Sequence, residues 1–68
     1  MKNINLDNVT YKIIKSLKSS DCTYYYTIDI KNDKEVVFLC EEKDIDKTII
    51  YKVDEREYPI LMNKFSIK

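Results

Sequence analysis

Alternation of side-chain polarity between residues 23 and 41 constrains the fold of this chain more than any other feature. Tyrosine and isoleucine occupy every second position of residues 24–31, the period-two pattern of a strand that buries one face. Residues 36–40 resume the pattern with β-branched and aromatic side chains, and the intervening residues 32–34 are turn-forming types. The pattern therefore predicts a β-hairpin.

Two loop lengths fit this hairpin. A loop of residues 32–34 would place Lys31 opposite Glu35, a favourable cross-strand pair of opposite charges. A two-residue loop suits a type I′ turn but would place Lys31 opposite Lys34. We prefer the three-residue loop, because it avoids opposing two like charges.

Apolar residues at three- and four-residue spacing precede the hairpin. They are Leu6, Val9, Ile13 and Leu17, with Ile14 beside them. At about 100° per residue they fall on one side of a helix, for which Asp7 is a suitable N-cap and residues 19–21 a suitable end. We therefore expect an N-terminal helix that buries this stripe against the sheet.

The opposite side of that helix would be basic. It would carry Lys12, Lys15 and Lys18, together with Tyr11. A charged outward side is normal for a surface helix, so a solvated surface is the simplest interpretation. The alternative is a helix that contacts phosphate groups through the three lysines, although the formal net charge of zero argues against it.

Two further segments complete the expected fold. Residues 48–53 alternate as a third strand, after a polar connection over residues 41–47. Residues 59–68 suit an edge strand or a short helix, and we favour the strand. Short connections between consecutive strands indicate an antiparallel meander. The sequence thus predicts one small α+β domain over residues 1–68, with the N-terminal helix packed on a three- to four-stranded antiparallel β-meander.

The predicted sheet has apolar residues on both faces. The face beneath the helix would carry Tyr26, Phe38, Cys40 and Val53 among others. The second face would carry Tyr25, Val37, Leu39 and Ile50. Soluble monomers rarely leave such a patch open. Either the C-terminal tail covers it, with Leu61, Phe65 and Ile67, or a second chain does.

Two absences from the composition limit the chemistry. The sequence contains no glycine and no histidine. Without glycine there is no phosphate-cradling loop, Rossmann fingerprint or nucleophile elbow, and without histidine the commonest general base and metal ligand is missing. We therefore expect no catalytic residue, no metal, no cofactor, no small-molecule substrate and no enzyme activity. The preference for residues with A/T-rich codons points to an AT-rich bacterium, a phage or a virus.

Cys22 and Cys40 lie near the outer ends of the two hairpin strands. In the expected register they are offset by three or four residues, roughly 10 Å, which is too far for a disulfide. Two free thiols, no apolar run long enough to span a membrane and no signal peptide together indicate a cytoplasmic protein.

The function that these features favour is a small non-enzymatic interaction protein. It would bind a protein partner or form a homodimer through the second sheet face, at the four residues Tyr25, Val37, Leu39 and Ile50, and would act as an inhibitor or accessory protein. One alternative is a nucleic-acid-binding module that uses Lys12, Lys15 and Lys18. Another is an acidic-surface inhibitor of a nucleic-acid-binding protein, because residues 41–58 carry seven carboxylates against four basic groups.

Overall fold

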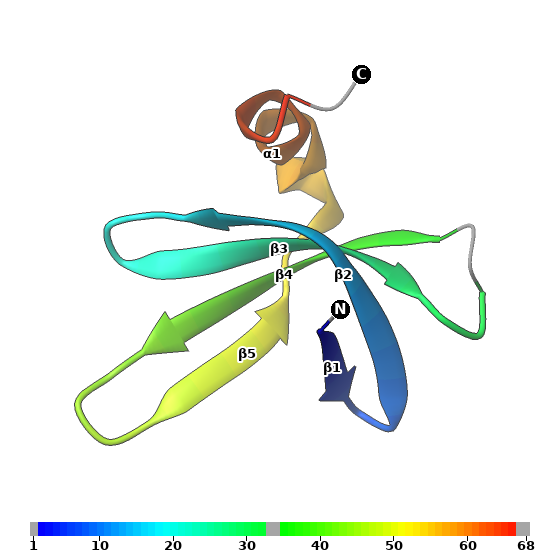
Figure 1. Cartoon of the computed structure of the whole chain (residues 1–68). Helices are drawn as coiled ribbons and strands as arrows, with labels where there is room; N and C mark the ends of the chain where they lie inside the picture. The colour runs from blue at the N-terminus through cyan, green and yellow to red at the C-terminus, as the bar shows by residue number, and fades with distance from the viewer. Residues whose placement is uncertain (1, 33–34, 67–68) are drawn as a thin grey trace.

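The computed structural model describes residues 2–32 and 35–66, which form a curled five-stranded sheet followed by a short helix (Figure 1). The elements are β1 (Asn3–Leu6), β2 (Val9–Lys18), β3 (Cys22–Asp29), β4 (Val36–Lys43), β5 (Thr48–Lys52), the 3₁₀ helix η1 (Glu55–Glu57) and α1 (Tyr58–Lys64). Every strand pairs antiparallel with the next, in the order β1-β2-β3-β4-β5. The antiparallel arrangement of consecutive strands is confirmed, but the prediction of three to four strands is wrong, because the sheet has five. The prediction of an N-terminal helix is wrong, because the N-terminal residues form β1 and β2.

A β-bulge explains why the sequence of β2 resembles a helix. Ile13 pairs with Thr27 of β3, whereas Lys15 pairs with Tyr26, so Ile14 is an extra residue in the strand. The bulge reverses the side-chain alternation, and Leu17 therefore lies on the opposite face from Tyr11. Apolar residues on the two faces of β2 are therefore four residues apart along the chain, the same spacing as apolar residues on one face of a helix.

The connection between β1 and β2 is a two-residue turn. Asp7 and Asn8 have φ angles of 51° and 65°, as the two central residues of a type I′ turn require. Leu6 pairs with Val9 directly across this turn. Asp7 is therefore a turn residue and not the predicted N-cap.

The β3–β4 hairpin is confirmed, but its register differs from both predicted loops. Ile28 pairs with Val36, and the amide of Asp29 donates to the carbonyl of Glu35 at 3.2 Å. Lys31 therefore does not lie opposite Glu35. The predicted loop residues Asp33 and Lys34 lie outside the described part of the chain.

The outer face of the curled sheet packs against α1. Its buried cluster consists of Phe38, Cys40, Val53, Leu61 and Phe65. The sequence assigned the first three of these to the face beneath a helix, and they lie beneath one, but it is the C-terminal helix (Figure 1). The strand predicted for residues 59–68 is wrong, because Pro59 stands in the first turn of α1, where its missing N–H costs nothing.

The inner face of the curl has a second apolar core. Its buried residues are Tyr11, Val37 and Leu39, and Ile4, Leu6, Val9, Tyr25 and Ile50 pack around them. The single buried polar side chain among the described residues, Thr27, donates from its hydroxyl to the carbonyl of Val37 at 2.7 Å. The N-terminal hairpin, which curls beneath the sheet, thus covers the face that the sequence left open.

Candidate functional site

The four residues predicted for a protein interface share the inner face. Tyr25 pairs directly with Leu39, and Val37 and Ile50 belong to the same apolar cluster. Leu39 is 0% and Val37 6% exposed, because β1 and β2 lie over them. Tyr25 and Ile50 are half-buried. In this fold, therefore, Val37 and Leu39 are core residues and offer no surface to a partner.

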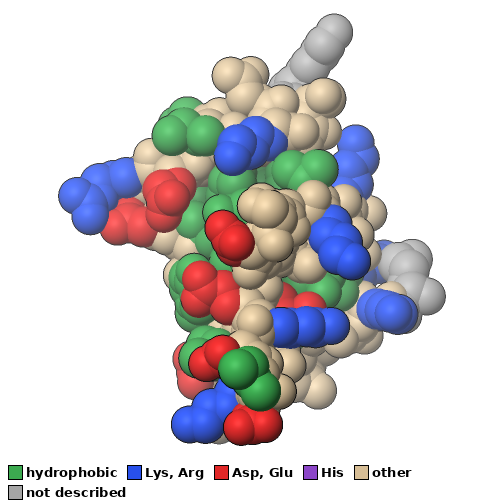
Figure 2. Space-filling view, turned by 90° about the vertical axis from the view of Figure 1, so that its left-hand side faces the viewer, with side chains coloured by type: hydrophobic (Ala, Val, Ile, Leu, Met, Phe, Trp, Pro, Cys, Tyr) green, Lys and Arg blue, Asp and Glu red, His purple; other side chains and the backbone are tan. Residues whose placement is uncertain are grey.

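Three of the exposed apolar side chains lie on β5 and the loop before it, and others lie on β2, on α1 and beyond β3. Ile49 is 52% and Tyr51 41% exposed, and Ile45 in the β4–β5 loop is 96% exposed. We call these three residues the β5 edge surface. Figure 2 looks at the end of the molecule where the β2–β3 and β4–β5 turns lie, and it shows hydrophobic side chains at the surface among acidic ones.

No strand formed by residues 2–32 or 35–66 pairs with the outer side of β5. β5 is the last strand in the order of the sheet, so only β4 pairs with it. The amide of Val53 donates to the carbonyl of Phe38 at 2.9 Å, and Tyr51 pairs with Cys40 in the same ladder. Alternation of antiparallel hydrogen bonds therefore turns the amides of Thr48, Ile50 and Lys52 away from β4. Such an edge is a template for a further strand.

The structure does not bring the three predicted phosphate contacts together. Lys12 pairs with Ile28 and Lys15 with Tyr26, which places both lysines on the outer face. Lys18 pairs with Thr23 and points to the inner face, because the bulge and the strand alternation separate it from the other two. The basic stripe expected on a helix therefore does not exist.

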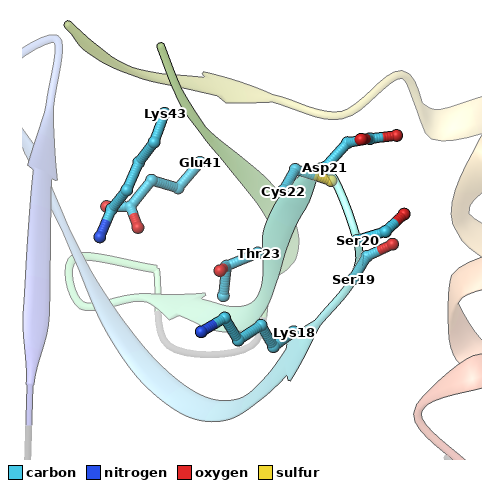
Figure 3. A pocket seen from close by; sticks show the side chains of 8 residues that line it. All are labelled: Lys18, Ser19, Ser20, Asp21, Cys22, Thr23, Glu41 and Lys43. Atoms are coloured by element: carbon cyan, nitrogen blue, oxygen red, sulfur yellow. The ribbon is translucent and has the colours of Figure 1, made fainter. Parts of the chain in front are cut away.

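Lys18 belongs to a different basic group, at the open end of the inner face. Two adjoining hollows of about 600 Å³ and 210 Å³ lie there, and Thr23, Glu41 and Lys43 line both. Lys2 lines the larger hollow and Lys18 the smaller. Figure 3 shows Lys18, Lys43 and Glu41 extending into the same space beside Thr23. We call the two hollows together the mouth.

Tyr25 forms one wall of the mouth and is fixed by a neighbour. Its hydroxyl donates to Glu41 Oε1 at 3.1 Å. Burial first, and then this hydrogen bond, raises the pKa of the Tyr25 phenol. No local sequence pattern selects Lys2, Thr23, Glu41 and Lys43 as a group, because the mouth exists only when the sheet curls. Only the pairing of Thr23 with Glu41 follows from a correct hairpin register.

The two cysteines lie on the outer face as free thiols. Cys22 pairs with Glu42 and Cys40 with Tyr24, so the offset between them is two residues and not three or four. Burial raises the pKa of the Cys40 thiol, which leaves little reactive thiolate at neutral pH. Hydrogen bonding to Cys22, followed by burial, raises the pKa of Tyr24 to about 12. Cys40 therefore contributes to the packing of the outer face and lacks the lowered thiol pKa of a nucleophile.

Other kinds of site find no support in the described residues. Across residues 2–32 and 35–66, no three side chains of the metal-ligating types come together. No helix in the same ranges is long and apolar enough to cross a membrane. Comparison with protein-family models, with curated proteins and with solved structures gave no match to this chain.

Proposed function

We propose that this chain is a small non-enzymatic interaction protein that assembles through the outer edge of β5. The observation that carries the proposal is that the last strand of the sheet combines unpaired backbone groups with exposed Ile49 and Tyr51. Natural proteins usually protect such an edge with charged side chains, proline or a covering segment. Here charge occurs only at the end of the strand, at Lys52, and in the preceding loop.

The partner that fits this edge is a second copy of the chain. When two β5 strands pair antiparallel about Ile50, the outward amides and carbonyls of Thr48, Ile50 and Lys52 all meet counterparts, because residue numbers in each pair sum to the same value. The same register places Ile49 opposite Tyr51 of the partner, an aromatic and β-branched pair that stabilises sheets. It opposes Thr48 to Lys52, so no like charges meet within the strand.

A dimer formed in this way would join two five-stranded sheets into one continuous sheet. The contact involves one short strand and few side chains, so we expect a weak association with a Kd on the order of micromolar. The function proposed from the sequence, binding through one face of the sheet, thus becomes binding through its edge. The inner face is occupied by the N-terminal hairpin of the same chain.

Sedimentation equilibrium tests the proposal. The unmodified chain is expected to be a dimer at high micromolar concentration. Thr48→Pro removes one outward amide at the first residue of the strand, where proline is tolerated, and Ile49→Lys places two charges in the paired edge. Both variants are expected to be monomers with unchanged circular dichroism.

Ile30→Lys is the matched control, since Ile30 is similarly exposed but lies beyond β3, and it should remain a dimer. A monomeric unmodified chain, or a dimer that persists in Ile49→Lys, would overturn the proposal. Retention of the dimer in Thr48→Pro alone would show that side chains rather than the strand ladder hold the two copies together, and would overturn the β5 pairing.

A further inference from the structure

The mouth has the size of a small-molecule site. Its larger hollow of about 600 Å³ falls within the range of roughly 300–1,000 Å³ that is typical of ligand pockets. Its walls come from four strands, β1 to β4, and lie at the open end of a curled sheet, where small barrels commonly bind ligands. The backbone of Lys2 is held in place, because its carbonyl accepts a hydrogen bond of 3.1 Å from the amide of Ile13.

Basic groups dominate the charge of the mouth. Lys2, Lys18 and Lys43 line it, against the carboxylates of Asp21 and Glu41. Among the described residues none of these three lysines forms an ion pair, and Asp54 with Arg56 is the pair that the structure shows. Lys18, Lys43 and Glu41 extend into the same space and Lys2 lines the larger hollow, so lysines outnumber carboxylates in the mouth by three to two, which favours an anionic ligand.

The walls of the larger hollow are suited to a flat ring. Ile4 and Ile13 stand on the β1–β2 side and the half-buried ring of Tyr25 on the β3 side. The bond from its hydroxyl to Glu41 fixes the tyrosine, so the ring offers a surface for stacking at little entropic cost. Stacking of this kind is worth about 1–3 kcal/mol for a nucleic-acid base on an aromatic side chain.

Polar groups beside Tyr25 can discriminate between ligands that carry different bases. Glu41 uses Oε1 to accept from Tyr25, and its other carboxylate oxygen remains as an acceptor at the hollow. A carboxylate accepts well from the exocyclic amino group of a base such as cytosine. The hydroxyls of Ser16 and Thr23 supply further hydrogen-bonding groups on the same walls.

We propose that the mouth binds one nucleotide unit, with an amino-bearing base against Tyr25 and Glu41 and the phosphate among Lys2, Lys18 and Lys43. A free mononucleotide and one residue of a single-stranded nucleic acid present the same chemistry. The site is separate from the β5 edge surface, because none of the residues of that surface lines the mouth. Nucleotide binding is therefore independent of the dimer proposed above.

The experiment is an NMR titration of the ¹⁵N-labelled chain with cytidine monophosphate, uridine monophosphate and a short single-stranded oligocytidine. Amide shifts of Ser16, Thr23 and Tyr25 report occupation of the mouth. Cytidine monophosphate is expected to move these signals and to bind more tightly than uridine monophosphate. A preference of about tenfold or more for the oligonucleotide over the mononucleotide would identify a nucleic-acid strand as the source of the unit.

Three variants locate the site. Lys43→Gln, at an exposed lysine, is expected to weaken cytidine monophosphate binding about tenfold, the effect of one charge-assisted hydrogen bond. Glu41→Gln should abolish the preference for cytidine over uridine with a smaller effect on affinity. Lys64→Gln in α1 removes the same charge far from the mouth and should change nothing.

The titration is repeated with Ile49→Lys, which separates the site from self-association. Shifts confined to residues outside the mouth, absence of shifts at millimolar nucleotide, or equal losses in Lys43→Gln and Lys64→Gln would each overturn the proposal. Equal affinity for both mononucleotides in the unmodified chain would overturn the role assigned to Glu41.

Discussion

Tyr58 and Phe38 fasten the C-terminal helix to the sheet by a hydrogen bond and a ring contact at once. The amide of Phe38 in β4 donates to the Tyr58 hydroxyl at 3.3 Å, and the two rings meet edge to face with centroids 4.8 Å apart. Phe38 is fully buried, so its amide has no access to water. The tyrosine hydroxyl thus satisfies a backbone group that would otherwise be left without a partner where the pairing of β4 with β5 ends.

Tyr58→Phe is expected to lower the free energy of unfolding by about 1–3 kcal/mol, the cost of a buried donor without an acceptor. In a domain of this size each kcal/mol corresponds to a fall in Tm of roughly 4–8 °C. Thermal unfolding followed by circular dichroism measures the change. Tyr26→Phe is the control, because its ring stays stacked on Phe38 and its hydroxyl makes no hydrogen bond within the described residues; equal effects of the two variants would contradict the role of the Phe38 amide.

Asn8 in the β1–β2 turn supports a second prediction. Its φ of 65° costs most residues about 1–2 kcal/mol, whereas asparagine and glycine adopt it readily. Asn8→Ala should therefore destabilise the chain by about 1 kcal/mol, and Asn8→Gly should leave stability unchanged or raise it. Urea unfolding of both variants measures the change in the free energy of unfolding. Asn63→Ala in α1 is the control and should not be destabilising; a neutral Asn8→Ala would show that this turn is not the one described.

The β3–β4 hairpin and the third strand could be predicted from the sequence because both are regular. Their side chains alternate without interruption, and period two is a local property of the chain. The same regularity correctly placed Tyr25, Val37, Leu39 and Ile50 on one face. Strand β2 could not be recognised in this way, since a bulge at Ile14 interrupts its alternation. The β-branched and aromatic content of residues 9–14 and the Asp7–Asn8 pair were the signals that favoured a hairpin there.

Neither the C-terminal helix nor the mouth could be predicted from local sequence patterns. Residues 59–68 suited a strand and a short helix equally well, and Pro59 favoured neither, because proline is common in the first turn of a helix. Lys2 and Lys43 both line the larger hollow although they lie far apart in the chain, and only the curl of the sheet brings them together. Curl depends on twist summed over five strands, so no short stretch of sequence specifies it.

Leu39 and Ile49 are apolar residues of neighbouring strands, but Leu39 is buried and Ile49 is exposed. Leu39 is fully buried in the inner core, so Leu39→Ala is expected to cost about 2–5 kcal/mol and Leu39→Asp to unfold the chain. Ile49→Ala removes an exposed side chain and should change the stability of the monomer by about 0.5 kcal/mol or less. Urea unfolding at low protein concentration measures both. A folded Leu39→Asp variant would contradict the closed inner face.

Alkaline pH is expected to destabilise the fold through its tyrosines. Hydrogen bonding to Cys22 and burial raise the pKa of Tyr24 to about 12, and hydrogen bonding to Cys40 and burial also raise the pKa of Tyr51. An unfolded phenol ionises near about pH 10, so above this pH the unfolded chain loses protons that the folded chain retains. The stability is therefore fully present below about pH 10 and is lost as the pH rises through the folded values.

Lys52 acts in the same direction. Its ammonium lies 5.8 Å from the centroid of the Tyr11 ring, and hydrogen bonding to Tyr11 raises its pKa, so its contribution is also lost as the pH rises through the folded value. Urea midpoints measured between about pH 8 and about pH 12 should fall only above about pH 10, together with the appearance of the tyrosinate absorbance band. Tyr24→Phe should flatten part of this fall, whereas a midpoint independent of pH over the same range would contradict the environments described for these phenols.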